Sequence, residues 1–410
     1  MSIVKIAAVV YGGGHVRSLK PILERLNSEP GVEVHVLALT TAYQDLRDTS
    51  LNVYRFKDIP VSRDLIDRAL PIGEKFAGTV SKHSHVSLEE THAYLGLNLI
   101  ELIDQYSSEA EALKAYHASG RQIFFPVQCL KKWLAAVEPK VLLTTTSPRA
   151  EKASIFAAFE LGIPTVVVVD LFAEGPEFEW LSNPDLGLYL CLMNSIVKDR
   201  FADKINAEFL IEAANPAFIP PIINSERIRK RTSKLRILWA PSPEPAVHPE
   251  TGFKGDTEWP KRLGEGLKEV LAPLESVVEL VMRPHPNHPD TVPDSCILDP
   301  IPDIWESLAR TDILITTVST VAIQARYLGI PTIVIEGSIV YDQTPLIDYG
   351  YATRHIAEED IYFLGCKHYL NETIHIENNQ PERLTDSVAK ISSLVLSLAG
   401  SNIDALESDC

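Results

Sequence analysis

Two short polar segments in the second half of the chain carry residue types that bind phosphate. The first is Arg283-Pro-His-Pro, in which His285 lies between two prolines. Proline on both sides keeps the backbone extended, so this histidine is not expected in the core of a helix. The second is a run of hydroxyl side chains that ends in Ser319 and Thr320, where a helix is predicted to begin and where both hydroxyls are expected to act as caps. Imidazole, guanidinium and a helix start all stabilise an anion, so the two segments predict one shared phosphate site.

Two further polar residues follow apolar segments that we predict to be buried strands. Ser242 follows residues 236–240, and Glu336 follows residues 332–335. In open parallel sheets the ligand lies at the carboxyl ends of the strands. We therefore expect Ser242 beside the ligand at this edge. Glu336 is expected on ribose or sugar hydroxyls, with a solvated loop carboxylate as the alternative.

The first half of the chain opens with an apolar strand, residues 4–10, followed by three glycines and His15. Gly12, Gly13 and Gly14 let the backbone approach a ligand closely and adopt positive φ angles. A plain tight turn is the alternative to a ligand-binding loop. The glycines lack the complete dinucleotide spacing, and threonines stand where an acidic ribose ligand is expected, so a nicotinamide cofactor is disfavoured. His15 is expected to orient an acceptor or to donate to a phosphate.

A general base for an acceptor hydroxyl is expected near the same sheet edge. Asp170 and Glu174 lie in a loop directly after the apolar run 166–169. Carboxylates at this place face the ligand side of a parallel sheet and can accept a proton. Loop solubility is the alternative for each. Asp170, Glu174 and His15 are all candidate catalytic bases, and the sequence does not choose among them.

The elements that must position these residues repeat along the chain. Both halves contain an apolar strand, a hydroxyl-rich turn, a helix and the same five residues, LGIPT, at 161–165 and 328–332. Glycine followed by proline commonly ends a helix, so a shared helix stop is the alternative explanation. The repeated order of features favours two Rossmann-like halves. We predict an α/β fold with two Rossmann-like domains facing across a cleft.

The domain boundaries follow from the prolines and the mixed charges in the middle of the chain. We predict a first domain over residues 1–218, a linker over 219–234 and a second domain over 235–385. Residues 386–410 are predicted to form a terminal helix and a polar tail.

Composition limits the function classes. The chain has 410 residues, 45% of them hydrophobic, and a net charge of −17. This acidity argues against nucleic acid as the main ligand. The five cysteines are scattered without a metal-ligand spacing, and the longest apolar tract is interrupted by charge and proline, so no transmembrane segment is expected. The chain begins directly with a strand rather than a signal peptide, and we expect a cytoplasmic protein.

With these residues in view, the chain resembles the two-Rossmann-domain glycosyltransferases, the GT-B architecture, over most of its length. The second half is most similar to the CDP-glycerol glycerophosphotransferase and capsule-polysaccharide transferase families. In the first half, the glycine loop is similar to that of UDP-N-acetylglucosamine transferases. The segments that carry the likeness are residues 12–15, 215–216, 237–242, 283–286, 312–320 and 328–331.

The resemblance implies a transferase that moves a glycosyl or polyol-phosphate group from a nucleotide-activated donor to a glycan or lipid-linked acceptor. It places this reaction in surface-polysaccharide or glycoconjugate biosynthesis. It also implies that the first domain holds the acceptor and that the second domain, with Ser242, holds the nucleotide of the donor. Neither a metal nor a cofactor is expected, since Arg283, His285 and the helix start would stabilise the leaving nucleotide. A UDP-sugar 2-epimerase-like enzyme shares the architecture and is the first alternative. A non-catalytic nucleotide-sugar-binding protein is the second.

Overall fold

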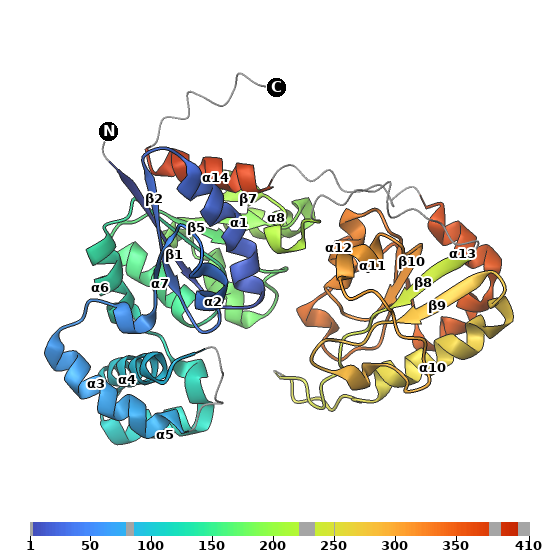
Figure 1. Cartoon of the computed structure of the whole chain (residues 1–410), viewed down its shortest axis with the longest axis horizontal. Helices are drawn as coiled ribbons and strands as arrows, with labels where there is room; N and C mark the ends of the chain where they lie inside the picture. Colours follow the sequence, from blue (N-terminus) through green and yellow to red (C-terminus); the bar gives the residue numbers. More distant parts are fainter. Residues whose placement is uncertain (1–2, 79–85, 221–233, 250, 377–386, 401–410) are drawn as a thin grey trace. The chain divides into compact units, whose positions relative to one another are not determined.

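The structure is a computed structural model that describes residues 3–78, 86–220, 234–249, 251–376 and 387–400. The chain divides into two compact units, unit 1 with Met1–Ala217 and Thr385–Cys410, and unit 2 with Phe218–Leu384. Each unit is a parallel sheet covered by helices, so the predicted α/β class with two Rossmann-like domains is confirmed (Figure 1). The predicted linker, residues 219–234, lies almost entirely outside the described residues.

The sheet of unit 1 has the strand order β3-β2-β1-β4-β5-β6-β7, and every neighbouring pair is parallel. Its central strands are apolar runs that are buried on both faces, as expected where helices cover both sides of a sheet. The seven strands are β1 (Val4–Val10), β2 (Val32–Ala38), β3 (Asn52–Tyr54), β4 (Val141–Thr144), β5 (Thr165–Val168), β6 (Leu188–Leu192) and β7 (Leu210–Glu212).

Alternate residues of β1 point into two separate cores. Ile6 and Ala8 pack with α1 (Gly14–Ser28) and α14 (Ser387–Leu398), which lie side by side (Figure 1). The terminal helix, predicted as a segment of its own, is therefore part of unit 1. Ala7 and Val9 belong to the core formed with the other helices. These are α3 (Arg63–Ala77), α4 (Leu88–Gln105), α5 (Glu109–Ser119), α6 (Val127–Val137) and α7 (Ala150–Glu160), while α2 (Ala42–Leu46) and α8 (Ser195–Ala202) lie beside β2 and β7.

A buried carboxylate joins α4 to the short 3-10 helix η1 (Phe56–Asp58) that follows β3. Glu90 is 6% exposed and accepts hydrogen bonds from the backbone N–H groups of Phe56 at 3.0 Å and Lys57 at 3.1 Å. Burial raises the pKa of Glu90 to about 7, and the two hydrogen bonds only partly oppose this effect.

We expect this carboxylate to make the stability of the protein depend on pH. A carboxylic acid whose folded-state pKa lies above its unfolded value binds more protons when folded, so its contribution to stability falls as pH rises from about 4.5 to 7. At about 1.4 kcal/mol per pKa unit, the total loss is about 3 kcal/mol. Thermal unfolding of Glu90→Gln between pH 5 and 8 should therefore show a flatter dependence than the parent protein. Glu89→Gln, which changes an exposed neighbour, is the control and should keep the parent slope; an unchanged slope in Glu90→Gln would refute the assignment.

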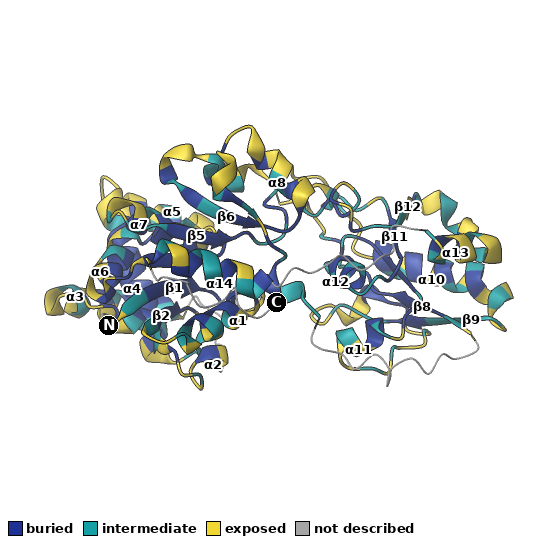
Figure 2. Ribbon diagram, turned by 90° about the horizontal axis from the view of Figure 1, so that it is seen from above, coloured by how far each residue is buried: buried dark blue, intermediate teal, exposed yellow. Residues whose placement is uncertain are grey.

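The sheet of unit 2 has the order β12-β11-β10-β8-β9 and is also parallel throughout. Its strands are β8 (Leu235–Trp239), β9 (Val278–Met282), β10 (Ile313–Thr316), β11 (Thr332–Ile335) and β12 (Arg354–Ile356). The buried residues of α10 (Trp259–Leu271) pack against these strands, whose buried residues are dark blue in Figure 2. The other α-helices that the structure describes in this unit are α11 (Ile304–Leu308), α12 (Val321–Tyr327) and α13 (Lys367–Ile374).

The repeated LGIPT segments have the same geometry in both units, an outcome that both the predicted duplication and a shared helix stop would produce. Gly162 and Gly329 have φ angles of 67° and 70°, a region that favours glycine. The following N–H group, of Ile163 or Ile330, donates to a carbonyl five residues earlier, at 2.9 Å in each unit. This is the Schellman arrangement that ends a helix. Each segment then continues directly into a central strand.

Candidate functional site

In unit 1 the strand order changes direction between β1 and β4, since β2 and β3 extend the sheet on one side and β5 to β7 on the other. Loops at such a switch point diverge and leave room for a ligand beyond the carboxyl ends of the strands. The predicted glycine loop and His15 follow β1, and the turn 145–147 follows β4. The sheet order therefore brings these two segments to the same edge.

Close packing requires glycine at one position of the glycine loop, and a positive φ angle favours glycine at the next. A Cβ atom on Gly12 would lie 1.9 Å from Thr41 Oγ1, and Gly13 has a φ angle of 75°. The Gly12 N–H donates to Thr40 Oγ1 at 3.4 Å. The two threonines that stand in place of a ribose-binding acid thus pack against the loop. Helix α1 begins at Gly14 with no side-chain cap and no acidic residue in its first turn.

His15 is the end of a hydrogen-bonded chain that reaches a fully buried carboxylate. Its Nδ1 lies 2.6 Å from Thr145 Oγ1, and the Thr145 hydroxyl donates to Glu151. Glu151 is 0% exposed and also accepts from the N–H groups of Tyr11 at 2.8 Å and Ser147 at 2.9 Å. Sequence reasoning missed Thr145 and Glu151. The available signal was a charged residue in the first turn of α7, a helix otherwise mostly apolar.

The two predicted catalytic carboxylates have different surroundings. Burial raises the pKa of Asp170, and the nearby His15 acts in the opposite direction, so these two candidates lie at one site. Glu174 instead forms an ion pair with Arg200, which also donates to the Phe172 carbonyl at 2.8 Å. Leu171 in the same loop has a positive φ of 47°. Arg200 and Glu174 therefore hold the loop in a conformation that is unfavourable for its sequence.

In unit 2 the strand order changes direction between β8 and β10, and hydrogen bonds join the turns that follow these strands. The Ser242 N–H donates to Thr317 Oγ1 at 3.1 Å, and the Ser242 hydroxyl donates to the Val318 carbonyl at 3.3 Å. Thr316 Oγ1 also donates to the Ala240 carbonyl at 2.6 Å. Ser242 thus lies beside the predicted hydroxyl turn, and its partner Thr317 is a residue of that turn that was not predicted as a ligand residue.

The hydroxyls of this turn cap α12 less completely than expected. Thr320 occupies the N-cap position, but its side chain makes no capping hydrogen bond. The Ser319 hydroxyl accepts from the Val321 N–H at a long 3.4 Å. The predicted capping role is therefore wrong for Thr320 and weak for Ser319. Their predicted contact with phosphate stays a prediction.

His285 follows β9, which is the neighbour of β8 on the side away from β10. Strands are about 4.8 Å apart, so the ends of β9 and β10 are roughly 10 Å apart. His285 Nδ1 accepts from the Asn287 N–H at 3.3 Å, and the neutral ring therefore carries its proton on Nε2. Burial, followed by the neighbouring His288, lowers the pKa of His285 and favours this neutral form.

Arg283 and Glu336 both have partners inside unit 2. Arg283 donates to Asp299 at 2.9 Å and to the Ile301 carbonyl at 2.7 Å, so its guanidinium is engaged in the internal structure. Glu336 contacts the Nδ1 atom of His355. The predicted ligand roles of these two residues stay predictions. A phosphate contact by Arg283 would have to share the guanidinium with Asp299.

A buried glutamate that the sequence did not single out joins two loops of unit 2. Glu244 is 5% exposed and accepts from the Ser338 hydroxyl at 2.7 Å and the Ile339 N–H at 2.8 Å. It thereby fixes the loop after β11 to the loop after β8. Gly337 lies in this anchored loop, where a Cβ atom would lie 3.0 Å from the Trp259 ring.

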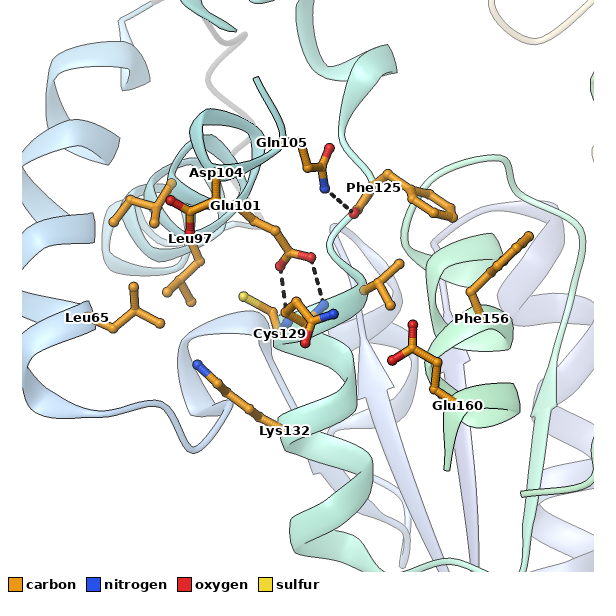
Figure 3. A pocket seen from close by; sticks show the side chains of 13 residues that line it. Leu65, Leu97, Glu101, Asp104, Gln105, Phe125, Cys129, Lys132, Phe156 and Glu160 are labelled. Atoms are coloured by element: carbon orange, nitrogen blue, oxygen red, sulfur yellow. Dashed lines mark hydrogen bonds between the residues drawn. The ribbon is translucent and has the colours of Figure 1, made fainter. Parts of the chain in front are cut away.

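A pocket of about 460 Å³ lies elsewhere in unit 1, between α3, α4, α6 and α7 (Figure 3). Apolar side chains such as Leu97 and Phe156 line it together with Glu101. Glu101 accepts from the N–H groups of Gln128 at 2.6 Å and Cys129 at 3.1 Å, and these bonds fix the start of α6 (Figure 3). None of the predicted site residues lines this pocket.

Comparison with known proteins bears on the fold. The chain is similar to MurG of Acinetobacter baumannii, with a TM-score of 0.57 and 14% identity over 96% of this chain and 99% of that one. It is similar to S. aureus MnaA, solved with UDP, with a TM-score of 0.55 and 10% identity over 98% of both chains. The chain is also similar to UDP-GlcNAc 2-epimerase from Neisseria meningitidis, solved with UDP-GlcNAc, with a TM-score of 0.55 and 14% identity over 96% of this chain and all of that one.

These likenesses, together with the two parallel sheets, show that the chain has the GT-B fold. No protein-family profile matches the chain, and no curated protein matches its sequence. The predicted resemblance to CDP-glycerol glycerophosphotransferases therefore stays a prediction. Within the part of the chain that the structure describes, no helix has the length and apolar character needed to cross a membrane.

Proposed function

We propose that the protein transfers a glycosyl group from a nucleotide-activated donor to an acceptor hydroxyl, with the nucleotide bound by unit 2 and the acceptor by unit 1. The observation that carries this proposal is the hydrogen-bonded cluster of Ser242 and residues 317–318 at the β8/β10 switch point. Ligands of doubly wound sheets bind at such points. Proteins of the same fold have been solved with UDP and with UDP-GlcNAc, which supports a nucleotide sugar as the donor.

Among the predicted donor-binding residues of unit 2, Arg283 is engaged by Asp299, and the others offer hydrogen-bond donors. The Ser319 and Thr320 hydroxyls lie on one side of the switch point, and neutral His285, with its Nε2–H, lies on the other. The strands that carry these residues end roughly 10 Å apart. A ligand that reaches the loops after both strands is better matched by a nucleoside diphosphate than by a lone phosphate. We therefore propose a UDP-sugar as the donor to test first, with CDP-linked and CMP-linked donors next.

The candidate bases of unit 1 differ in their surroundings. Glu174 is paired with Arg200, and burial raises the pKa of Asp170. His15 is partly exposed, with 25% of its side chain accessible, and follows the glycine loop. We propose His15 as the base and Asp170 as a neighbouring group that contacts the acceptor. The product is proposed to be a surface polysaccharide or glycoconjugate.

A thermal-shift panel of UDP, CDP, CMP and GDP tests nucleotide binding. At 100 times its Kd, one nucleotide should stabilise the folded protein by about 2.7 kcal/mol. His285→Ala should remove most of this shift, whereas His368→Ala, which changes a histidine with 80% of its side chain exposed, should preserve it. The proposed donor site would be contradicted if no nucleotide raised the unfolding temperature, or if His285→Ala kept the complete thermal shift of the parent protein.

A UDP-sugar 2-epimerase activity is the second candidate, because several proteins of the same fold are named as such enzymes. The two reactions differ in their need for a second substrate. A transferase should release UDP from UDP-GlcNAc only when a hydroxyl acceptor is added. An epimerase should convert the UDP-sugar alone, and a binding protein should do neither.

A further inference from the structure

The hydrogen bonds around Glu151 determine which ring nitrogen of His15 carries a proton. Glu151 Oε1 accepts from the Tyr11 N–H. Its Oε2 accepts from the Ser147 N–H and from the Thr145 hydroxyl. An ionised carboxylate only accepts hydrogen bonds, so the single hydroxyl proton of Thr145 points to Glu151. The Thr145 oxygen is then an acceptor, and His15 Nδ1, 2.6 Å away, must be the donor.

We propose that Thr145 and Glu151 are positioning residues that hold neutral His15 in the Nδ1–H tautomer, so that Nε2 is the atom that removes the proton from the acceptor. The chemical role of Nε2 rests on the proposed transfer function. In that step the acceptor oxygen bonds to the anomeric carbon of the donor. The bond from that carbon to the nucleotide oxygen breaks, its electron pair leaves with the phosphate, and the acceptor proton moves to His15 Nε2.

The same carboxylate also stabilises the charge that this step creates. Once Nε2 is protonated, the His15 imidazolium has its Nδ1 atom 3.7 Å from Glu151 Oε2. Glu151 has no exposed side-chain surface, so solvent screens this attraction little. An imidazole held by a carboxylate in this way gains both a defined tautomer and a stabilised cation. Here a threonine hydroxyl lies between the ring and the carboxylate.

The fold alone does not require a carboxylate at this position. Counted from the end of the preceding strand, Glu151 of α7 corresponds to Ile323 of α12 in the repeated strand–turn–helix of unit 2. Ile323 is 0% exposed, so the residue at the same count in unit 2 is a buried aliphatic side chain. A buried charge is costly without compensating contacts. The three hydrogen bonds to Glu151 compensate its buried charge, and this charge lies close enough to His15 to stabilise the imidazolium.

The tautomer can be measured without any substrate. In the full-length protein labelled with ¹⁵N-histidine, two-bond ¹H–¹⁵N correlations at neutral pH distinguish protonated Nδ1 from protonated Nε2, and His15→Gln assigns the His15 signals. The parent protein and Thr145→Ser, which keeps the hydroxyl, should show Nδ1–H. Thr145→Val should move His15 toward Nε2–H. Thr144→Val, which removes the adjacent buried hydroxyl that donates to the Val9 carbonyl at 2.8 Å, should leave His15 unchanged.

An Nε2–H signal for His15 in the parent protein would overturn the inference, even if every variant failed to fold. An unchanged tautomer in folded Thr145→Val would do the same. With a donor and an acceptor, Thr145→Val should lower kcat about 100-fold with little change in KM, and Thr145→Ser should restore most of it. If His15 shows the Nδ1–H tautomer but no donor and acceptor give turnover, only the proposed function is refuted. If the protein transfers sugar and His15 shows the Nε2–H tautomer, only this inference is refuted.

Discussion

Replacing His15 by glutamine is expected to lower the rate of acceptor-dependent nucleotide release by about 10²–10⁴-fold, the usual contribution of a general base. Glutamine keeps much of the polar character of the side chain but cannot accept a proton at neutral pH. Because unit 2 is proposed to bind the nucleotide, the UDP-induced thermal shift should remain. The measurement is UDP release from UDP-GlcNAc with and without an acceptor, together with the thermal shift.

The control for this change is His368→Gln, in α13 of unit 2, where 80% of the side chain is exposed. It should retain both activity and nucleotide binding. A His15→Gln protein with parent activity would exclude His15 as the base and leave Asp170 as the remaining candidate at this sheet edge. Loss of the thermal shift in His15→Gln would instead show that unit 1 takes part in nucleotide binding.

Replacing Asp299 by alanine is expected to destabilise unit 2 by about 3–5 kcal/mol, because it leaves a buried cation without its partner. Asp299 has 1% of its side chain exposed and accepts from Arg236 at 2.7 Å and Arg283 at 2.9 Å. Arg236 is itself buried, with 8% of its side chain exposed. The Ser307 hydroxyl donates to the same carboxylate at 2.6 Å. Urea unfolding followed by tryptophan fluorescence measures the loss.

The same carboxylate gives a pH dependence of opposite sign to that of Glu90. Burial alone would raise the pKa of Asp299, but hydrogen bonds from Ser307 and Arg283 bring the pKa below its usual value. Its contribution to stability is therefore complete above the unfolded pKa, about 3.9, and is lost as pH falls through the folded value.

Asp294→Ala is the matched control, because this aspartate has 95% of its side chain exposed in its ion pair with Lys261. Exposed pairs contribute little, so no clear change is expected. A loss below about 1 kcal/mol in Asp299→Ala would contradict the prediction. It would show that Arg236 pairs instead with Glu279, whose carboxylate lies 3.8 Å from the guanidinium Nε.

Short-range patterns were sufficient to predict the strands next to the candidate site in both units, but not β3, β6, β7 or β12. The apolar run before Gly12 is β1, and the two LGIPT segments end α7 and α12 with nearly equal glycine φ angles. These features depend on residues within about one turn of each other, through burial of apolar runs and the conformational freedom of glycine. The glycine loop with His15 could be predicted for the same reason.

The partners of the site residues depend on contacts between distant parts of the chain. Glu151 and Tyr11 are 140 residues apart, and they meet because β4 lies beside β1. The pairing of Glu174 with Arg200, and the place of α14 beside α1, likewise follow from strand order and packing. No local pattern encodes which carboxylate meets which donor.

The sequence by itself determined the fold class, the strand ends that carry polar residues and the chemical types present there. Only the tertiary structure decided that Arg283 is engaged by Asp299 and that His15 is joined through Thr145 to a buried carboxylate. The physical reason is that secondary structure follows from interactions along the chain, whereas the proton and charge state of a side chain follows from its neighbours in space.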